Sequence, residues 1–516
     1  MTNGVLGRGM RFLITAIALV GLLFAALLLS ASIAVIGFKF SAALSYGLAV
    51  LVIWTVLEAL ERFGSAFFRK YEPWLIMAFF LLLYLVVMQL APEVGQRRMP
   101  YDSLRAQKSL ESGHIAFYRP QYLYYWINYD FVLSVLGIVF SPKLIVGQIL
   151  NAVCRAVTLY PIFRLSERMS GRRVARLVTL VTALSPALIV YSTTLVGDFL
   201  SAMFYLYAVY FFLVKSDWER FSANNIVLWL VVGFLFGLGY LFKTVSFLYA
   251  AALGVFIVLR LLSKCNIRVT LLLCASVFSI GLAFNTVKSI RTDMFVAARE
   301  MSGIRDDPGP SFWSGVLREV WLGLCIDTGG SYSPNRDRAF GAATKEKKIE
   351  MVKNMLVNDM KRYPQFFVYK FKRVWGSNDS LGSILYWFRA SCQKDCYKPR
   401  DKNYCPKWLA PLLRAEHLMV SFLFFLGALG FLLSTGRRRQ MDFWIIGSMS
   451  MTILLSYAVL SMVIESHGRY RTVVYPFFFM VIPYICVWFE KDNPIYVRIG
   501  GLFGWLRKRI KGRHER

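Results

Sequence analysis

The sequence predicts an all-α protein that crosses a membrane about twelve times and carries one loop domain of mixed secondary structure on the outer side. Two observations predict this fold class. Of the 516 residues, 57% are hydrophobic and only 17% are charged, and the mean hydropathy is +0.50. The apolar residues also gather into runs of about 17 to 25, the helix length that crosses roughly 30 Å of hydrocarbon. Such a composition excludes an ordinary soluble enzyme.

Twelve apolar runs mark the predicted transmembrane helices. The first run is longer than the apolar stretch of a signal peptide, and no clean cleavage site follows it, so we expect it to be a membrane anchor. The runs cover residues 13–36, 43–60, 74–91, 144–163, 174–191, 197–214, 226–242, 245–262, 269–287, 418–434, 443–463 and 473–489.

The basic residues predict the orientation of these helices. Every second short connection is rich in Lys and Arg, as in residues 164–176, which is typical of cytoplasmic loops when the N-terminus is inside. The net charge of +30 therefore reflects topology and attraction to anionic lipid. Because the basic clusters are scattered between spans, we do not expect a nucleic-acid partner.

This topology divides the chain into five parts. Residues 1–73 hold two N-terminal spans, and residues 74–290 form the core with a first outer loop at 92–143. An outer loop domain at 291–417 contains an amphipathic, helical stretch from Thr344 to Val374. The last three spans lie at 418–490, and residues 491–516 form a basic cytoplasmic tail.

Half of the eight cysteines fall in the large outer loop, where an oxidising compartment permits disulfides. One or two bridges are expected, and two bridges allow three connectivities. A zinc site formed by the last three of these cysteines is an open alternative. The four residues are Cys325, Cys392, Cys396 and Cys405.

Two acids stand out at the outer membrane edge, where ionisable groups are costly and usually functional. Asp102 follows the third span and opens a short predicted helix at 103–112, and Asp198 lies at the turn between two spans. Each has an alternative reading, because Asp is a favoured residue at a helix start.

Basic residues accompany these acids. Lys243 ends a Gly-rich span, where a lysine can also simply extend to the interface. The short outer loop before the last span contains His467, Arg469 and Tyr470. Two arginines in this loop, at 469 and 471, oppose the positive-inside trend, which favours a bound anion.

A carboxylate can take a proton from a hydroxyl, while Lys and Arg stabilise the charge of a departing phosphate. The set therefore favours transfer of a group from a phosphate-bearing lipid to an acceptor hydroxyl. Two alternatives remain: a lipid-linked saccharide flippase or other transporter, and a non-catalytic assembly or export scaffold.

At this point the sequence resembles the GT-C glycosyltransferases, in particular family 39, which contains protein O-mannosyltransferases and bacterial aminoarabinose transferases. The resemblance covers residues 74–490, and the order of weak motifs carries it. The motifs are Pro100-Tyr101-Asp102, residues 148–155 and 163–176, Leu184-Ser185-Pro186, Asp198, the span ending at Lys243, residues 321–332, Trp375-Gly376, Arg469-Tyr470 and Tyr475-Pro476.

The resemblance implies that Asp102 is the catalytic base and that Asp198 shapes the catalytic site. It also implies that Lys243, Arg469, Tyr470, His467 and Arg155 contact the substrate or the lipid phosphate.

The implied donor is a polyprenyl-phosphate sugar, a hexose or pentose, and the acceptor is a glycan, lipid or protein of the cell envelope. Neither metal nor cofactor is expected. The missing eukaryotic sugar-binding domain favours a bacterial plasma (inner) membrane with the site facing outside. Residues 118–130 depart from the family pattern, which puts sugar or acceptor recognition in question and makes Asp130 an additional candidate.

Overall fold

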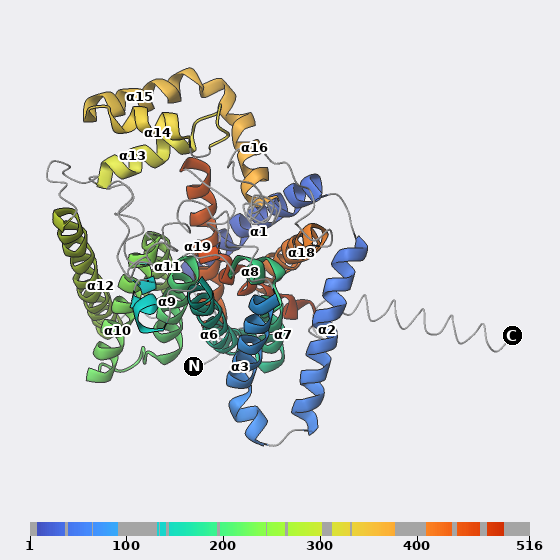
Figure 1. Cartoon of the computed structure of the whole chain (residues 1–516). Helices are drawn as coiled ribbons and strands as arrows, with labels where there is room; N and C mark the ends of the chain where they lie inside the picture. Colours follow the sequence, from blue (N-terminus) through green and yellow to red (C-terminus); the bar gives the residue numbers. More distant parts are fainter. Residues whose placement is uncertain are drawn as a thin grey trace.

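The computed structural model of the chain is helical throughout its described part (Figure 1), which contains no strand. The fold is therefore the all-α membrane bundle that the composition predicts. The structure describes residues 8–36, 40–63, 66–90, 129, 132–133, 135–140, 144–192, 197–243, 245–263, 267–301, 312–330, 333–376, 409–435, 441–464 and 472–489.

Eight of the described helices are long and apolar enough to cross a membrane, and the bent pair α7 (Arg172–Ala183) and α8 (Pro186–Ser192) makes a ninth candidate span. The exact number of twelve is not confirmed. The eight are α1 (Arg8–Ile36), α6 (Leu144–Ser170), α9 (Asp198–Tyr210) with the π-helical turn η1 (Phe211–Lys215), α10 (Ala223–Phe242), α11 (Ser246–Ser263), α12 (Ile267–Met301), α18 (Leu409–Ser434) and α19 (Met441–Val463).

The three other predicted spans are helical but differ from simple transmembrane helices. In α2 (Phe40–Phe63) and α3 (Ala66–Leu90), charged residues occupy one end of each helix. The last predicted span is divided into α20 (Tyr475–Phe479) and the 3-10 helix η5 (Ile482–Phe489). A continuous apolar run thus does not ensure one continuous helix, because Pro476 and Pro483 interrupt the backbone hydrogen-bond pattern.

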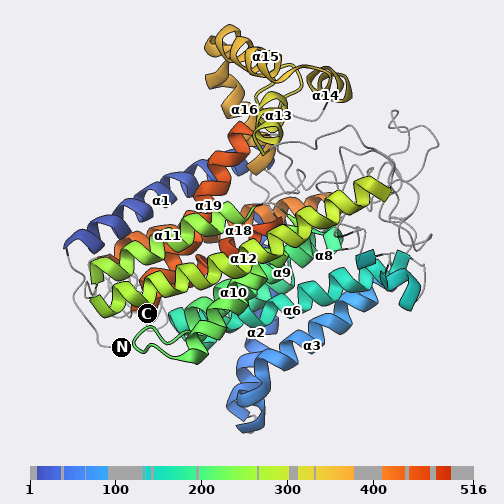
Figure 2. The same ribbon diagram turned by 90° about the vertical axis from the view of Figure 1, so that its left-hand side faces the viewer.

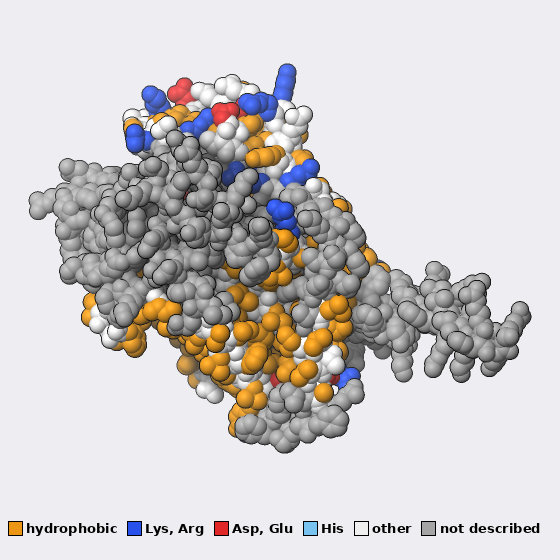
Figure 3. Space-filling view, turned by 45° about the vertical axis from the view of Figure 1, so that its right-hand side comes forward, with side chains coloured by type: hydrophobic (Ala, Val, Ile, Leu, Met, Phe, Trp, Pro, Cys, Tyr) orange, Lys and Arg blue, Asp and Glu red, His pale blue; other side chains and the backbone are white. Residues whose placement is uncertain are grey.

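The bundle is held together by close helix pairs, chiefly α10 with α12, α1 with α18, and α9 with α10 (Figure 2). Gly233 of α10 lies directly against the Ile280 carbonyl of α12, where a side chain would not fit. Small residues at such contacts allow membrane helices to approach closely. Hydrophobic side chains cover much of the described bundle surface in this view, as a lipid-facing protein requires (Figure 3).

A helical domain projects from the bundle, formed by α13 (Phe312–Gly323), α14 (Pro334–Gly341), α15 (Lys345–Asn358), the short 3-10 turn η2 (Met360–Arg362) and α16 (Tyr363–Trp375) (Figure 2). Thr344 begins α15 by accepting a hydrogen bond from the Lys347 amide. The helical prediction for 344–374 is confirmed, with an interruption around Asp359. The described part of the predicted mixed domain is entirely helical.

The foot of this domain is inserted among the membrane helices. The Trp375 indole at the end of α16 donates to Ser461 Oγ of α19 at 3.1 Å, and the Trp375 carbonyl lies 2.8 Å from His417 Nε2 of α18. Phe24 of α1 packs edge-on against Trp375. The first span therefore contacts the foot of this helical domain, which the topology predicts to be the outer domain.

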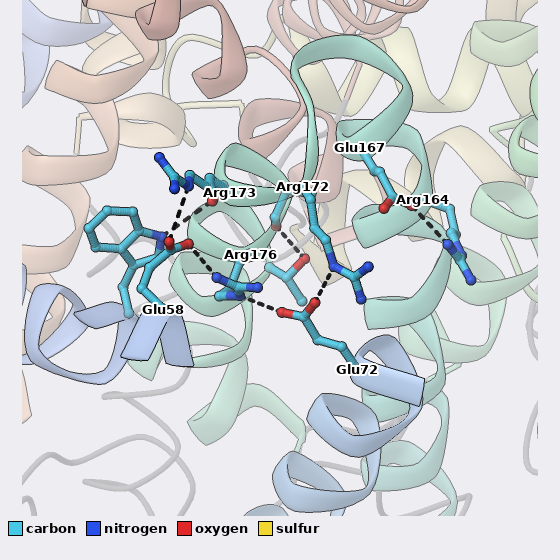
Figure 4. Close-up of polar contacts among 10 residues, drawn as sticks. Glu58, Glu72, Arg164, Glu167, Arg172, Arg173 and Arg176 are labelled. Carbon is cyan, nitrogen blue, oxygen red and sulfur yellow. Dashed lines mark hydrogen bonds and ion pairs between the residues drawn. The ribbon is translucent and has the colours of Figure 1, made fainter. Parts of the chain in front are cut away.

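A buried ionic network joins the N-terminal helices to the core at the end predicted to be cytoplasmic (Figure 4). Arg176 of α7 bonds both Glu58 of α2 and Glu72 of α3. Arg172 bonds Glu72 at 2.5 Å, and Arg173 contacts Glu58 at 3.3 Å. Buried charges persist in a membrane protein when they are paired in this way, so the network attaches α2 and α3 to α7.

Candidate active site

Two of the acidic and basic residues singled out in the sequence form an ion pair. The Lys243 ammonium group lies 3.1 Å from Asp198 Oδ1. Asp198 begins α9 and Lys243 directly follows α10, and the two helices are packed against each other with opposite directions. Their shared end therefore presents both charges, and the Asp198 side chain is only 3% exposed.

Two hydrogen bonds and the close approach of Gly239 to Tyr205 fix α9 against α10 beside this pair. Ser201 Oγ donates to the Gly239 carbonyl at 3.0 Å, and the Tyr205 hydroxyl donates to the Lys243 carbonyl at 2.8 Å. A Cβ atom at Gly239 would lie 2.8 Å from the Tyr205 ring. Glycine at 239 thus lets Tyr205 reach the backbone of Lys243.

Tyr191 is a site residue that the sequence reasoning missed. Its hydroxyl, which is fully buried, donates to Asp198 Oδ2 at 2.5 Å. Asp198 therefore binds Lys243 through one oxygen and Tyr191 through the other. The signal was weak, because Tyr191 ends an apolar run in which a tyrosine reads as a packing residue.

Arg155 supports the break between α7 and α8. Its guanidinium group donates to the carbonyls of Ala183 at 2.7 Å and Ser185 at 3.2 Å, and it lies over the Tyr84 ring. The Tyr84 hydroxyl also donates to the Ala183 carbonyl, at 2.8 Å. The Ala183 carbonyl lies at the end of α7 and lacks a partner within that helix, so Arg155 and Tyr84 satisfy it inside the bundle.

The same Arg155 lines a small cavity between α6, α7, α8, α9 and the segment at 472–476. Its other lining side chains are mostly apolar, with three threonines. They are Thr158, Leu159, Ile162, Thr182, Leu188, Phe199, Ala202, Thr472 and Pro476. The cavity therefore combines one cation with an apolar wall, and Phe199 directly follows Asp198 in the chain.

The segment that follows the predicted anion-binding loop is anchored beside the ion pair. Tyr205, which bonds the backbone of Lys243, stacks on Tyr249 with ring centres 4.2 Å apart. The Tyr249 hydroxyl in turn donates to the Val473 carbonyl at 3.1 Å. The chain at 473 is thus tied to the end of the bundle that carries Asp198.

The predicted site residues fall into two groups. Asp198 and Lys243 are in direct contact, and Arg155 lies at the helix break and in the cavity lined by Phe199. Asp102, Asp130, His467, Arg469 and Tyr470 lie outside the described residues. Cys325 is buried in the outer domain, while Cys392, Cys396 and Cys405 also lie outside the described part.

Residues 128–284, which contain the Asp198–Lys243 pair and Arg155, match the family model of dolichyl-phosphate-mannose-protein mannosyltransferases. This part of the chain is therefore similar to the GT-C type glycosyltransferases, as the motifs indicate. The resemblance stated from the motifs is thereby confirmed. No curated protein sequence matches the chain.

Solved structures that are similar to the chain include the following two. One is the oligosaccharyltransferase AglB from Archaeoglobus fulgidus, in complex with an inhibitory peptide and a dolichol-phosphate. It is 13% identical with a TM-score of 0.33, and the match covers 85% of this chain and 60% of AglB. The other is ArnT from Cupriavidus metallidurans in the apo state, which is 13% identical with a TM-score of 0.31 over 79% of this chain and 76% of ArnT.

Proposed function

We propose that this protein is a membrane glycosyltransferase, which moves a sugar from a polyprenyl-phosphate donor to a hydroxyl group of a cell-envelope glycan, lipid or protein. The reaction takes place at the outer face of a bacterial inner membrane. The observation that carries the proposal is the contact between Lys243 and Asp198, at the ends of two spans that the topology directs outward. A lysine oriented by a buried carboxylate suits a phosphate that gains charge as it leaves.

In this proposal the reaction is a single displacement at the anomeric carbon. Asp102 takes the proton of the acceptor hydroxyl, whose oxygen forms the new bond to the anomeric carbon. The bond from that carbon to the phosphate oxygen breaks, and the polyprenyl phosphate leaves with the electron pair. Lys243 and Arg469 stabilise the phosphate, with Arg155, His467 and Tyr470 as further contacts.

The geometry supports an orienting role for Asp198 in place of proton transfer. Both of its oxygens are engaged, one with the Lys243 ammonium and one with the Tyr191 hydroxyl. A carboxylate held in this way places Lys243, whereas a general base must reach the acceptor hydroxyl. Asp102 therefore remains the proposed base.

The cavity beside Arg155 is small, and its wall is almost wholly apolar, which matches the chemistry of a lipid tail. A long polyprenyl chain enters such a site from the bilayer. This is why the active site of the proposed enzyme lies at the membrane edge.

A transporter is favoured by one specific observation, because buried charges beside broken helices are typical of transporters. Arg155 lies beside the break between α7 and α8, which are bent by 50°. A flippase for a lipid-linked saccharide would move its substrate without cleaving it. The two functions therefore differ in whether the donor is consumed.

The deciding experiment uses the full chain in lipid vesicles with radiolabelled polyprenyl-phosphate sugars and a crude envelope acceptor fraction. Sugar should appear on the acceptor, and Asp102→Asn should abolish the transfer, while Asp293→Asn, an exposed acid on α12, should retain it. Full activity of Asp102→Asn would remove the base assignment. Translocation of intact donor without any transfer would establish the transporter instead.

A further inference from the structure

The carboxylate of Glu416, in α18, bonds the chain on the far side of the α7–α8 break. One oxygen accepts from Ser185 Oγ, and the other accepts from the Ala187 amide at 3.0 Å. Glu416 is completely buried and lies 231 residues from Ser185 in sequence. Ser185 and Ala187 flank Pro186, the first residue of α8.

Opposite charges therefore serve the two sides of the break. Arg155 donates to the Ala183 carbonyl at the end of α7, and Glu416 accepts the Ala187 amide hydrogen at the start of α8. The Ala183 carbonyl and the Ala187 amide lie at helix ends, where backbone groups lack a partner within their own helix. The bilayer offers them none either. The bend between α7 and α8 is thus held by side chains from two other helices.

The position of α8 determines where Tyr191 points. Tyr191 follows Ala187 by four residues in α8, so the two lie one above the other on the same face of the helix. A shift or rotation of the first turn of α8 would move the Tyr191 hydroxyl from Asp198, to which it donates at 2.5 Å. Contacts at Ala187 are therefore transmitted to the ion pair with Lys243.

Glu416 is itself rigidly placed. The next residue, His417, has Nε2 within 2.8 Å of the Trp375 carbonyl and 3.0 Å of Ser32 Oγ. This turn of α18 is thus fixed to the foot of the outer domain and to α1. A group that orients others must first be held by its own neighbours.

We propose that Glu416 is a positioning residue for sugar transfer, which orients α8 so that Tyr191 and Asp198 hold Lys243 in place. The inference rests on the proposed function. Glu416 touches neither donor nor acceptor and acts through Tyr191.

The test is a double-mutant cycle in the full chain reconstituted in vesicles, with a polyprenyl-phosphate sugar as donor. Glu416→Gln should lower kcat about tenfold with little change in the KM for the acceptor, as expected for lost orientation. In a Tyr191→Phe background, Glu416→Gln should lower kcat by less than about twofold. The effects of two residues that act as a unit are not additive. A full tenfold loss in that background would overturn the proposal, as would wild-type kcat for Glu416→Gln.

Glu58→Gln is the matched control, because it neutralises another buried carboxylate in the network far from Asp198 in the chain. It should lower stability and leave kcat near that of the wild type. If Glu416→Gln does not fold, Ser185→Ala removes the contact between Ser185 Oγ and Glu416 and should show the same dependence on Tyr191.

A readout without turnover separates this proposal from the proposed function. With 3-fluorotyrosine at position 191, the fluorine resonance should move in Glu416→Gln and stay in place in Glu58→Gln. An unmoved resonance in Glu416→Gln would contradict the positioning role. Absence of transfer by the wild-type protein from every donor, with a moved resonance, would reject the proposed function alone.

Discussion

The Lys370 ammonium group of the outer domain donates to the Ile464 carbonyl at the end of α19, at 2.7 Å. It also donates to the carbonyls of Met462 at 3.0 Å and Gly323 at 2.5 Å. Lys370 is fully buried, and an ammonium group has three hydrogens for these three acceptors. The Lys370 side chain therefore joins the middle of α16 to the ends of α13 and α19, directly before the predicted anion-binding loop at 465–471.

Lys370→Met should destabilise the protein by roughly 3 kcal/mol, because it leaves buried carbonyls without a donor. The midpoint of thermal unfolding in detergent should fall, and the outer domain should become sensitive to proteolysis. Lys372→Met, an exposed lysine on the same helix, should change neither property. Equal midpoints of thermal unfolding for Lys370→Met and Lys372→Met would show that the Lys370 contacts do not stabilise the fold.

Lys243→Met should reduce sugar transfer about 10²- to 10³-fold, the usual effect of removing a group that stabilises charge in the transition state. Lys243→Arg should retain part of the activity, since the positive charge remains. Initial rates with a polyprenyl-phosphate sugar measure both effects. Lys288→Met is the control, because Lys288 is an exposed lysine on α12. If its rate of sugar transfer falls as far as that of Lys243→Met, the effect is not specific to the ion pair.

The helices were predictable from sequence because lipid imposes long apolar runs, but their interruptions were not. The run at 174–191 reads as one span, although Pro186 begins a second helix bent by 50°. The break is stable because Arg155 and Glu416 satisfy its backbone groups, and these residues lie in other helices. Contacts between residues of distant helices leave no pattern in the local sequence.

The candidate site was predicted only in part, because the sequence shows charges at the ends of apolar runs but not contacts between distant helices. Asp198 and Lys243 were visible as charges at the ends of apolar runs, and antiparallel packing of α9 and α10 then brings them together. Glu416 was hidden because α18 begins at Leu409, earlier than the predicted span, so that this acid was placed in a loop. Tyr191 was hidden among apolar residues, where only the fold reveals its bond to Asp198.

Gly239→Ala should reduce both stability and transfer. The added methyl group would lie 2.8 Å from the Tyr205 ring and push α9 from α10, at a cost of about 1 to 3 kcal/mol. Activity should fall because Tyr205 bonds the backbone of Lys243. Gly254→Ala in α11 has open space around the new methyl group and should keep wild-type stability and activity.

Arg176→Met should release the N-terminal helices from the core. Arg176 is completely buried between Glu58 and Glu72, so its loss leaves buried carboxylates with fewer partners, which typically costs 3 to 5 kcal/mol. Arg173→Met should cost less than about 1 kcal/mol, because the Arg173 side chain is 68% exposed and water already screens its charge. Disulfide crosslinking between cysteines introduced on facing surfaces of α2 and α7 measures the attachment, and its efficiency should fall in Arg176→Met alone. Equal crosslinking in both variants would mean that apolar packing, and not the ionic network, holds α2 against α7.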